Sequence, residues 1–174
     1  MTSKNLLLLL SMAIALSACH PKPHPDAASA ATTTEQNGEA PDLLIPDTER
    51  NKVSLRGEIA KHQLTVVDFW ASWCGPCLQE MPNMVRLHND FAGKGLAIIG
   101  ISLDKENAAW QQAIREMDMK WLQLSALRGW DDDAAKMFGV NAIPHTIVFN
   151  QQGSILARGL RGDELHEFIA AQLK

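Results

Sequence analysis

The stretch Trp70-Ala71-Ser72-Trp73-Cys74-Gly75-Pro76-Cys77 sets two cysteines three positions apart, directly after a β-rich run. That run, residues 64–69, is apolar apart from two positions and predicts a buried strand. A helical pattern then continues to about Phe91, so Cys74 is expected at a helix start. There, unpaired backbone N–H groups and the helix dipole favour the thiolate, the attacking form of cysteine. The pattern therefore predicts a redox-active pair in which Cys74 attacks and Cys77 resolves.

Other uses of a Cys-x-x-Cys pair fit the sequence less well. Zinc sites commonly need a second cysteine pair or spaced histidines, and the only further cysteine is Cys19. Attachment of c-type haem needs a histidine directly after the second cysteine, where this chain has Leu78. A purely structural disulfide stays open as an alternative, although so short a loop gains little chain entropy. We expect neither a bound metal nor a cofactor.

The rest of the folded part, residues 41–174, alternates between strand and helix patterns. The order β-α-β-α-β-α-β-β-α predicts a mixed α/β sheet with helices on both faces. Asp163 is expected to cap the last helix. Trp110, Trp121 and Trp130 have no motif context and are interpreted as packing residues. After the first strand and helix, strands are expected at 96–103, 121–124, 146–149 and 154–157, and helices at 105–117, 132–138 and 163–173.

Residues 41–174 resemble the thioredoxin superfamily, and within it the TlpA/ResA-like membrane-anchored thiol-disulfide oxidoreductases. The resemblance rests on residues 67–77, on Pro82 and on Ile143-Pro144, which is similar to the family's cis-proline loop. It implies a thioredoxin-like fold with one extra strand–helix unit between the Cys-x-x-Cys and cis-proline loops. It also implies that a substrate pairs with the backbone of Ile143; a trans proline starting an edge strand is the alternative. The other implied substrate contacts are Trp73, Gly75, Pro76 and Pro144.

Two carboxylates and one histidine near these motifs are candidates for tuning the thiols. Asp68 interrupts an apolar strand, so it is either exposed by alternation or kept for proton transfer. The matching thioredoxin aspartate lies beneath the second cysteine and helps to deprotonate it, which implies a catalytic Asp68. Glu80 resembles a glutamate that tunes the thiols in TlpA/ResA-like proteins; a solvated helix carboxylate is the alternative. We interpret His145 as a surface or packing histidine rather than a metal ligand.

The N-terminus reads as an export and anchoring segment. Residues 1–18 carry Lys4 and an 11-residue, mostly apolar run, which predicts a signal peptide and is too short to span a bilayer. Residues 16–19, Leu-Ser-Ala-Cys, resemble the bacterial lipobox and imply a lipidated Cys19. An ordinary signal peptide with an incidental cysteine is the alternative. Residues 19–40 lack large apolar side chains and predict a flexible tether.

These features together predict a lipid-anchored reductase of protein disulfides in the bacterial cell envelope, facing the periplasm or the exterior. Expected partners are disulfide-bonded clients, such as an apocytochrome, and a membrane thiol carrier that returns the electrons. With 16 basic against 20 acidic residues, a nucleic-acid partner is not expected. A thiol peroxidase is one alternative, although Ala71 replaces the threonine of the peroxiredoxin pattern. A metal-binding chaperone using Cys74, Cys77 and His145 is another.

Overall fold

The computed structural model describes residues 39–173. The predicted signal peptide, Cys19 and the tether as far as residue 38 lie outside the described residues. Within the described part, no helix combines the length and apolar character needed to cross a bilayer.

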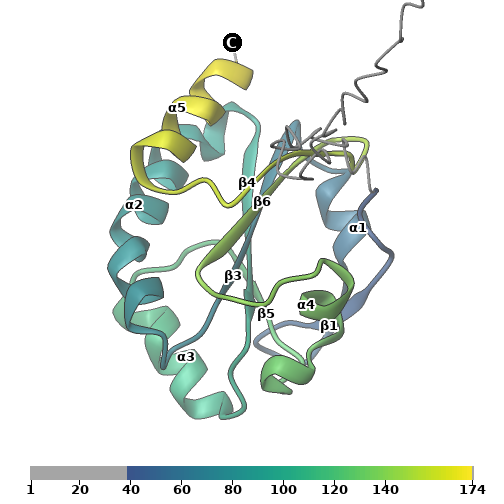
Figure 1. Ribbon diagram of the computed structural model, residues 1–174, viewed down its shortest axis with the longest axis vertical. Coiled ribbons are helices and arrows are strands. Elements are labelled where there is room, and N and C mark those ends of the chain that lie inside the picture. The colour runs from purple at the N-terminus through teal and green to yellow at the C-terminus, as the bar shows by residue number, and fades with distance from the viewer. Residues whose placement is uncertain (1–38, 174) are drawn as a thin grey trace, which may run out of the picture. The chain divides into compact units, whose positions relative to one another are not determined.

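A five-stranded sheet forms the centre of the domain (Figure 1). Strands β3, β4 and β5 are parallel, whereas β6 runs antiparallel to β3 and pairs with β7. All seven residues of β3 are buried, which explains why its sequence is a nearly continuous apolar run. The predicted mixed sheet is confirmed. Across the sheet, the strands are β5 (Leu122–Leu124), β4 (Leu96–Ser102), β3 (Leu64–Trp70), β6 (His145–Asn150) and β7 (Ile155–Arg158).

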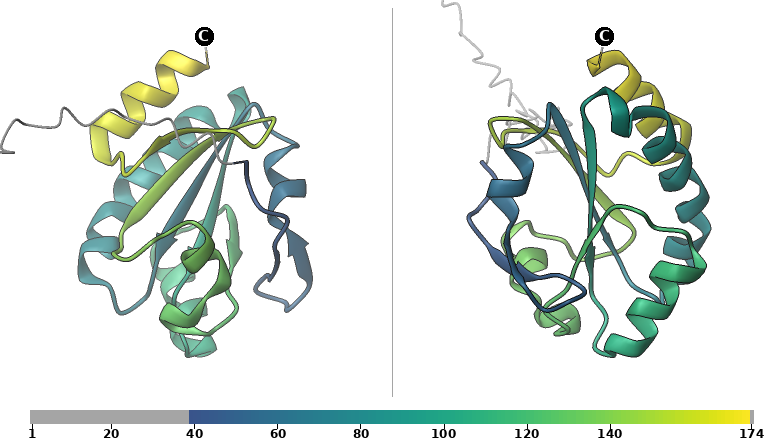
Figure 2. Two further views of the ribbon diagram at one scale, coloured as in Figure 1. Left: turned by 45° about the vertical axis from the view of Figure 1, so that its right-hand side comes forward. Right: turned by 180° about the vertical axis from the view of Figure 1, so that it is seen from behind.

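Helices cover both faces of the sheet, as predicted. One face carries α2 (Gly75–Phe91), α3 (Asn107–Glu116) and α5 (Gly162–Gln172), and the other carries α1 (Leu55–Ile59) and α4 (Asp133–Met137) (Figure 2). Because β3 and β4 are parallel, their carboxyl ends meet at one edge of the sheet, and the loop leading into α2 begins there. The extra unit predicted between the cysteine pair and Pro144 is present as α3 and β5.

Three short elements before β3 are not predicted by the sequence pattern. Strands β1 (Leu44–Pro46) and β2 (Lys52–Ser54) form a hairpin, and α1 follows directly. Ser54 caps α1, since its hydroxyl accepts a hydrogen bond from the backbone N of Gly57 at 3.0 Å. Each of these elements spans little more than one hydrophobic period, and Pro46 in β1 and Gly57 in α1 disfavour strand and helix, so the pattern did not reveal them.

Two predicted boundaries are wrong. The predicted tether includes Ala40, but the structure buries this residue, and its backbone N donates a hydrogen bond to the carbonyl of Gly153 at 2.8 Å. Asp163 does not cap α5, because the helix begins one residue earlier, with Arg161 as its N-cap. Asp163 instead forms an ion pair with Arg86 of α2. Both errors concern the first residues of a folded segment, which are held by contacts with residues distant in the sequence.

Candidate active site

Cys74 and Cys77 form a disulfide at the start of α2. Cys74 is the N-cap residue, and its Sγ accepts a hydrogen bond from the backbone N of Cys77 at 3.2 Å. Pro76 lies in the first helical turn. The N–H groups of that turn have no partner within the helix, so the lack of an N–H in proline costs no hydrogen bond there. Cys74 retains 6% of its surface and Cys77 none. The helix start therefore presents Cys74 to an incoming sulfur and shields Cys77.

The loop before β6 lies against this disulfide. The Ile143–Pro144 peptide bond is cis, as the resemblance implied. The carbonyl oxygen of Ile143 lies 3.9 Å from the Sγ of Cys74, although the two residues are 69 positions apart. Ile143 is half-buried and Pro144 is buried. A backbone carbonyl is thus held beside the sulfur that a client would reach.

The surface around the pair is open on the Trp73 side. Trp73 is 56% exposed, and Gly75 and Pro76 are exposed as well. Trp70, three residues earlier, is fully buried and donates from Nε1 to Oε1 of Gln123 at 3.1 Å. The structure therefore separates the two tryptophans into one surface residue and one core residue.

Asp68 is buried in the middle of β3, between Gly100 of β4 and Thr146 of β6. The alternative that strand alternation exposes it is excluded, because both faces of β3 are covered. Burial raises the pKa of Asp68 to about 7, the negative charge of Glu80 adds to the increase, and Arg161 opposes it. A carboxyl group with a pKa near neutral can take up and release a proton at physiological pH.

Glu80 joins two helices and is not a solvated carboxylate. It is half-buried, its Oε1 accepts a hydrogen bond from the backbone N of Gly162 at 2.6 Å, and its Oε2 accepts from Asn83 at 3.0 Å. Gly162 is the first residue of α5, so the side chain satisfies a free N–H at that helix start. Glu80 thus acts on the electrostatics of Asp68 and also attaches α5 to α2.

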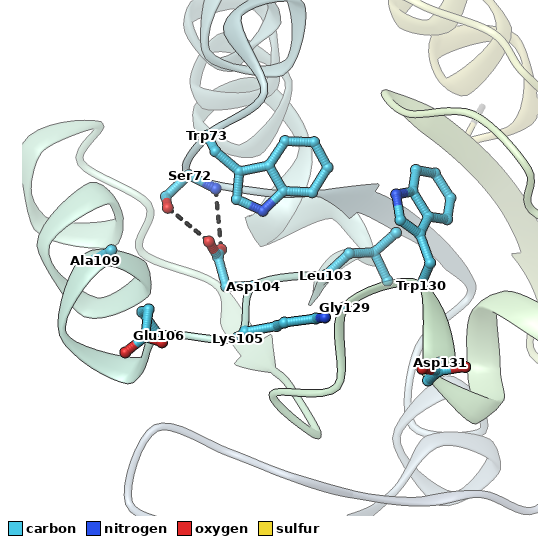
Figure 3. A pocket seen from close by; sticks show the side chains of 10 residues that line it. All are labelled: Ser72, Trp73, Leu103, Asp104, Lys105, Glu106, Ala109, Gly129, Trp130 and Asp131. Atoms are coloured by element: carbon cyan, nitrogen blue, oxygen red, sulfur yellow. Dashed lines mark hydrogen bonds between the residues drawn. The ribbon is translucent and has the colours of Figure 1, made fainter.

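Asp104 is a site residue that the sequence analysis missed. Its buried carboxylate accepts hydrogen bonds from the backbone N of Ser72 at 2.9 Å and from the Ser72 hydroxyl at 2.6 Å (Figure 3). It also accepts one from the Ser102 hydroxyl at 2.7 Å. The carboxylate therefore holds the backbone two residues before Cys74. The available signal was an aspartate directly after a buried parallel strand, at the sheet edge where β3 also ends.

His145 begins β6 and is half-buried opposite Phe69. Burial lowers its pKa, and the positive charges of Arg158 and Arg161 lower it further. The histidine is thus held in its neutral form near neutral pH. Across residues 39–173, no group of three or more His, Cys, Asp or Glu side chains is placed to hold a metal ion.

Comparison with known proteins places this site in a family. Residues 37–158 match the AhpC/TSA family. The chain belongs to the AhpC/TSA family. This AhpC/TSA protein is 27% identical over 136 residues to the thiol-disulfide oxidoreductase ResA of Bacillus thuringiensis subsp. konkukian, covering 78% of this chain and 75% of ResA. It is 30% identical over 123 residues to the thiol:disulfide interchange protein HelX of Rhodobacter capsulatus, covering 69% of this chain and 65% of HelX.

Solved structures resemble the AhpC/TSA protein over the same region. The thioredoxin domain of a thiol-disulfide oxidoreductase from Bacteroides vulgatus superposes with a TM-score of 0.72 at 30% identity, covering 79% of this chain and 97% of that domain. A thiol-disulfide oxidoreductase from Bacteroides fragilis gives a TM-score of 0.72 at 30% identity, covering 77% and 98%. The thioredoxin-like fold and the predicted resemblance to thiol-disulfide oxidoreductases are confirmed.

Proposed function

We propose that this AhpC/TSA protein is a thiol-disulfide oxidoreductase that reduces protein disulfides at the bacterial cell envelope. The observation that carries the proposal is the Cys74–Cys77 disulfide at a helix start, with the Ile143 carbonyl 3.9 Å from the more exposed sulfur. Relatives named ResA and HelX support the reaction type. Gly75-Pro76 between the cysteines resembles thioredoxin and favours reduction over disulfide introduction.

The proposed reaction is a pair of thiol-disulfide exchanges. In the reduced protein, the Cys74 thiolate attacks one sulfur of a client disulfide, and the other client sulfur leaves as a thiolate that takes up a proton. Cys77 then loses its proton and attacks Sγ of Cys74. This step releases the second client thiol and leaves the Cys74–Cys77 disulfide. Two electrons and two protons have passed to the client, and a dithiol carrier of the membrane returns two of each.

Each site residue has a role in these two exchange steps. The backbone N of Cys77, 3.2 Å from Sγ of Cys74, stabilises negative charge on the attacking sulfur. We assign Asp68 as the acceptor of the Cys77 proton, because its pKa of about 7 suits transfer near neutral pH. Glu80 acts through Asp68. Trp73, Gly75, Pro76 and the Ile143–Pro144 loop are assigned to client contact.

Attachment to a membrane is the part of the proposal that rests on residues 1–19 alone. We propose that Cys19 is lipidated after removal of residues 1–18. Two or more acyl chains would then hold the domain at a bilayer surface, since each buried CH₂ contributes about 0.8 kcal/mol. A periplasmic or exterior location follows from the same export signal.

Substituting each cysteine tests the mechanism. Cys74→Ser is expected to abolish reduction of insulin disulfides by the full-length protein, because the attacking sulfur is lost. Cys77→Ser is expected to accumulate mixed disulfides on Cys74, detected as reductant-sensitive adducts on a gel. Retention of wild-type activity by Cys74→Ser would overturn the proposal. Peroxide turnover exceeding disulfide reduction in the same preparation would instead favour the thiol peroxidase, although the buried Ala71 supplies no hydroxyl group near Cys74.

A further inference from the structure

Trp130 is a large apolar residue left at the surface, and it lines the same groove as Trp73, the neighbour of Cys74. It belongs to the short 3-10 helix η2 (Gly129–Asp131) and is 44% exposed. Trp130 and Trp73 lie on either side of Leu103 and line a groove of about 560 Å³ (Figure 3). A volume of this size lies within the range of binding pockets for small ligands. The groove therefore has room for one or two large side chains.

The chemistry of the groove suits an apolar occupant. Its apolar lining comes from the two tryptophans, Leu103 and Ala109. The carboxylate of Asp104 faces the same region, but Ser72 and Ser102 already donate to it. The charged residues Lys105, Glu106 and Asp131 also line the groove and are exposed, and Asp131 forms an ion pair with Lys136 at 3.0 Å. Because the buried Asp104 carboxylate is already hydrogen-bonded, the two tryptophans and Leu103 offer mainly aromatic and aliphatic contact.

The groove is continuous with the place where a client must bind. Trp73 lines the groove and directly precedes Cys74 in the chain, so the groove begins next to the reactive cysteine. An extended client chain advances about 3.3 Å per residue. When a client cysteine is at Cys74, residues a few positions along the chain reach the groove.

Two contacts keep the groove formed in the absence of a client. Asp104 fixes the backbone of Ser72, and with it the position of Trp73. Gly129 has φ +60°, a conformation that favours glycine, and the side chain of Lys105 packs against it, since a Cβ there would lie 2.7 Å from Cε of Lys105. A preformed site loses less conformational entropy on binding.

We propose that the groove between Trp73 and Trp130 is a subsite for an aromatic or large aliphatic side chain located two to four residues from the reacting cysteine of a client. This inference rests on the proposed disulfide reductase function and adds a substrate class to it. The groove selects clients by the residues next to their cysteines.

A peptide series tests the subsite. Disulfide-linked peptides carry one tryptophan at successive positions on either side of the cysteine, in an otherwise glycine and serine sequence. The reduced full-length protein is expected to show kcat/KM about tenfold higher for the best tryptophan position than for the all-glycine peptide, as for a buried aromatic anchor. Trp130→Ala is expected to bring this ratio close to one, and Trp130→Phe to keep most of it.

Met137→Ala is the matched control. Met137 is an apolar residue of α4, is 60% exposed and does not line the groove, so its removal should leave the ratio at the wild-type value. Equal rates for all peptides, or a ratio that survives Trp130→Ala, would overturn the subsite while leaving the reductase function intact. No reduction of any peptide by the wild type would overturn the function itself. A dimer that Trp130→Ala dissociates would show that a second copy fills the groove, and would also overturn the subsite.

Discussion

At the scale of single residues, Asp68 shows a conflict between stability and chemistry. A carboxyl group in the middle of a covered sheet is costly to ionise, and this cost is what raises its pKa to about 7. The same shift makes it a proton acceptor suited to neutral pH. The buried carboxyl group of Asp68, which the proposed proton transfer needs, is thus expected to lower the free energy of unfolding.

Asp68→Asn is expected to stabilise the oxidised protein increasingly as the pH rises. The folded pKa of about 7 lies above the ordinary value of 3.8, so between these values the folded state holds a proton that the unfolded state has lost. Wild-type stability therefore falls with rising pH across this window, by up to about 1.4 kcal/mol per pH unit, and the asparagine variant lacks this loss. Urea unfolding at several pH values measures the difference. Parallel stability curves would show that the pKa of Asp68 is not raised.

At the scale of elements, Glu80 couples the reactive helix to the C-terminal helix. Besides its bond to the backbone N of Gly162, α2 and α5 are joined by the Arg86–Asp163 and Asp90–His166 pairs. The Arg86–Asp163 ion pair and the Asp90–His166 hydrogen bond are largely exposed, where such contacts contribute little. The half-buried Glu80 bond at 2.6 Å is the stronger link.

Two substitutions at Glu80 separate its two roles. Glu80→Ala is expected to reduce the free energy of unfolding by about 1–3 kcal/mol and to speed hydrogen exchange in α5, because the Gly162 N–H loses its acceptor. Glu80→Gln retains an acceptor oxygen and should cost less stability. Burial is the main cause of the raised pKa of Asp68, and both variants remove the negative charge that adds to it, so both should shift the pH dependence of the Cys77 step to lower pH. Equal loss of stability in the two variants would contradict the assignment of the Gly162 bond.

At the scale of the whole molecule, the chain enters the domain at the end of the sheet opposite the cysteine pair. Glu39 pairs with Ser154 next to the β6–β7 turn, the same end at which Leu64 of β3 lies across from Asn150. Cys74 follows the other end of this seven-residue strand, about 20 Å away. An anchor upstream of Glu39 would therefore attach to the domain far from its reactive face, and leave that face accessible to soluble clients.

Cys19→Ser tests the anchor at this scale. We expect the variant to move from the membrane fraction to the soluble envelope fraction, because the proposed acylation site is lost. Reduction of insulin with dithiothreitol as electron donor should match the wild type, since Cys19 takes no part in the exchange. Re-reduction by membranes should be slower. A variant that stays with the membrane would show that residues other than Cys19 hold the protein there.

The parts predicted well from the sequence are those with local causes. The strand over 64–70, the helix after Cys74 and the alternation of the later elements follow from hydrophobic period and from residues that start or stop helices. The hairpin and α1 were missed because they are short and contain Pro46 and Gly57, residues that disfavour strand and helix. The misplaced cap at Asp163 reflects an ion pair with Arg86, which lies 77 positions away and competes with local capping.

The sequence alone determined the reactive pair, its place at a helix start and the thioredoxin-like class, because these depend on residues adjacent in the chain. Only the tertiary structure decided the environment of that pair. It places Ile143 beside Cys74, buries Asp68 next to the charge of Glu80, binds Asp104 to Ser72 and leaves Trp130 facing Trp73 across Leu103. Each of these arrangements brings together residues from different elements of the fold. Their consequences, a raised pKa and a preformed groove, come from burial and packing that no local pattern specifies.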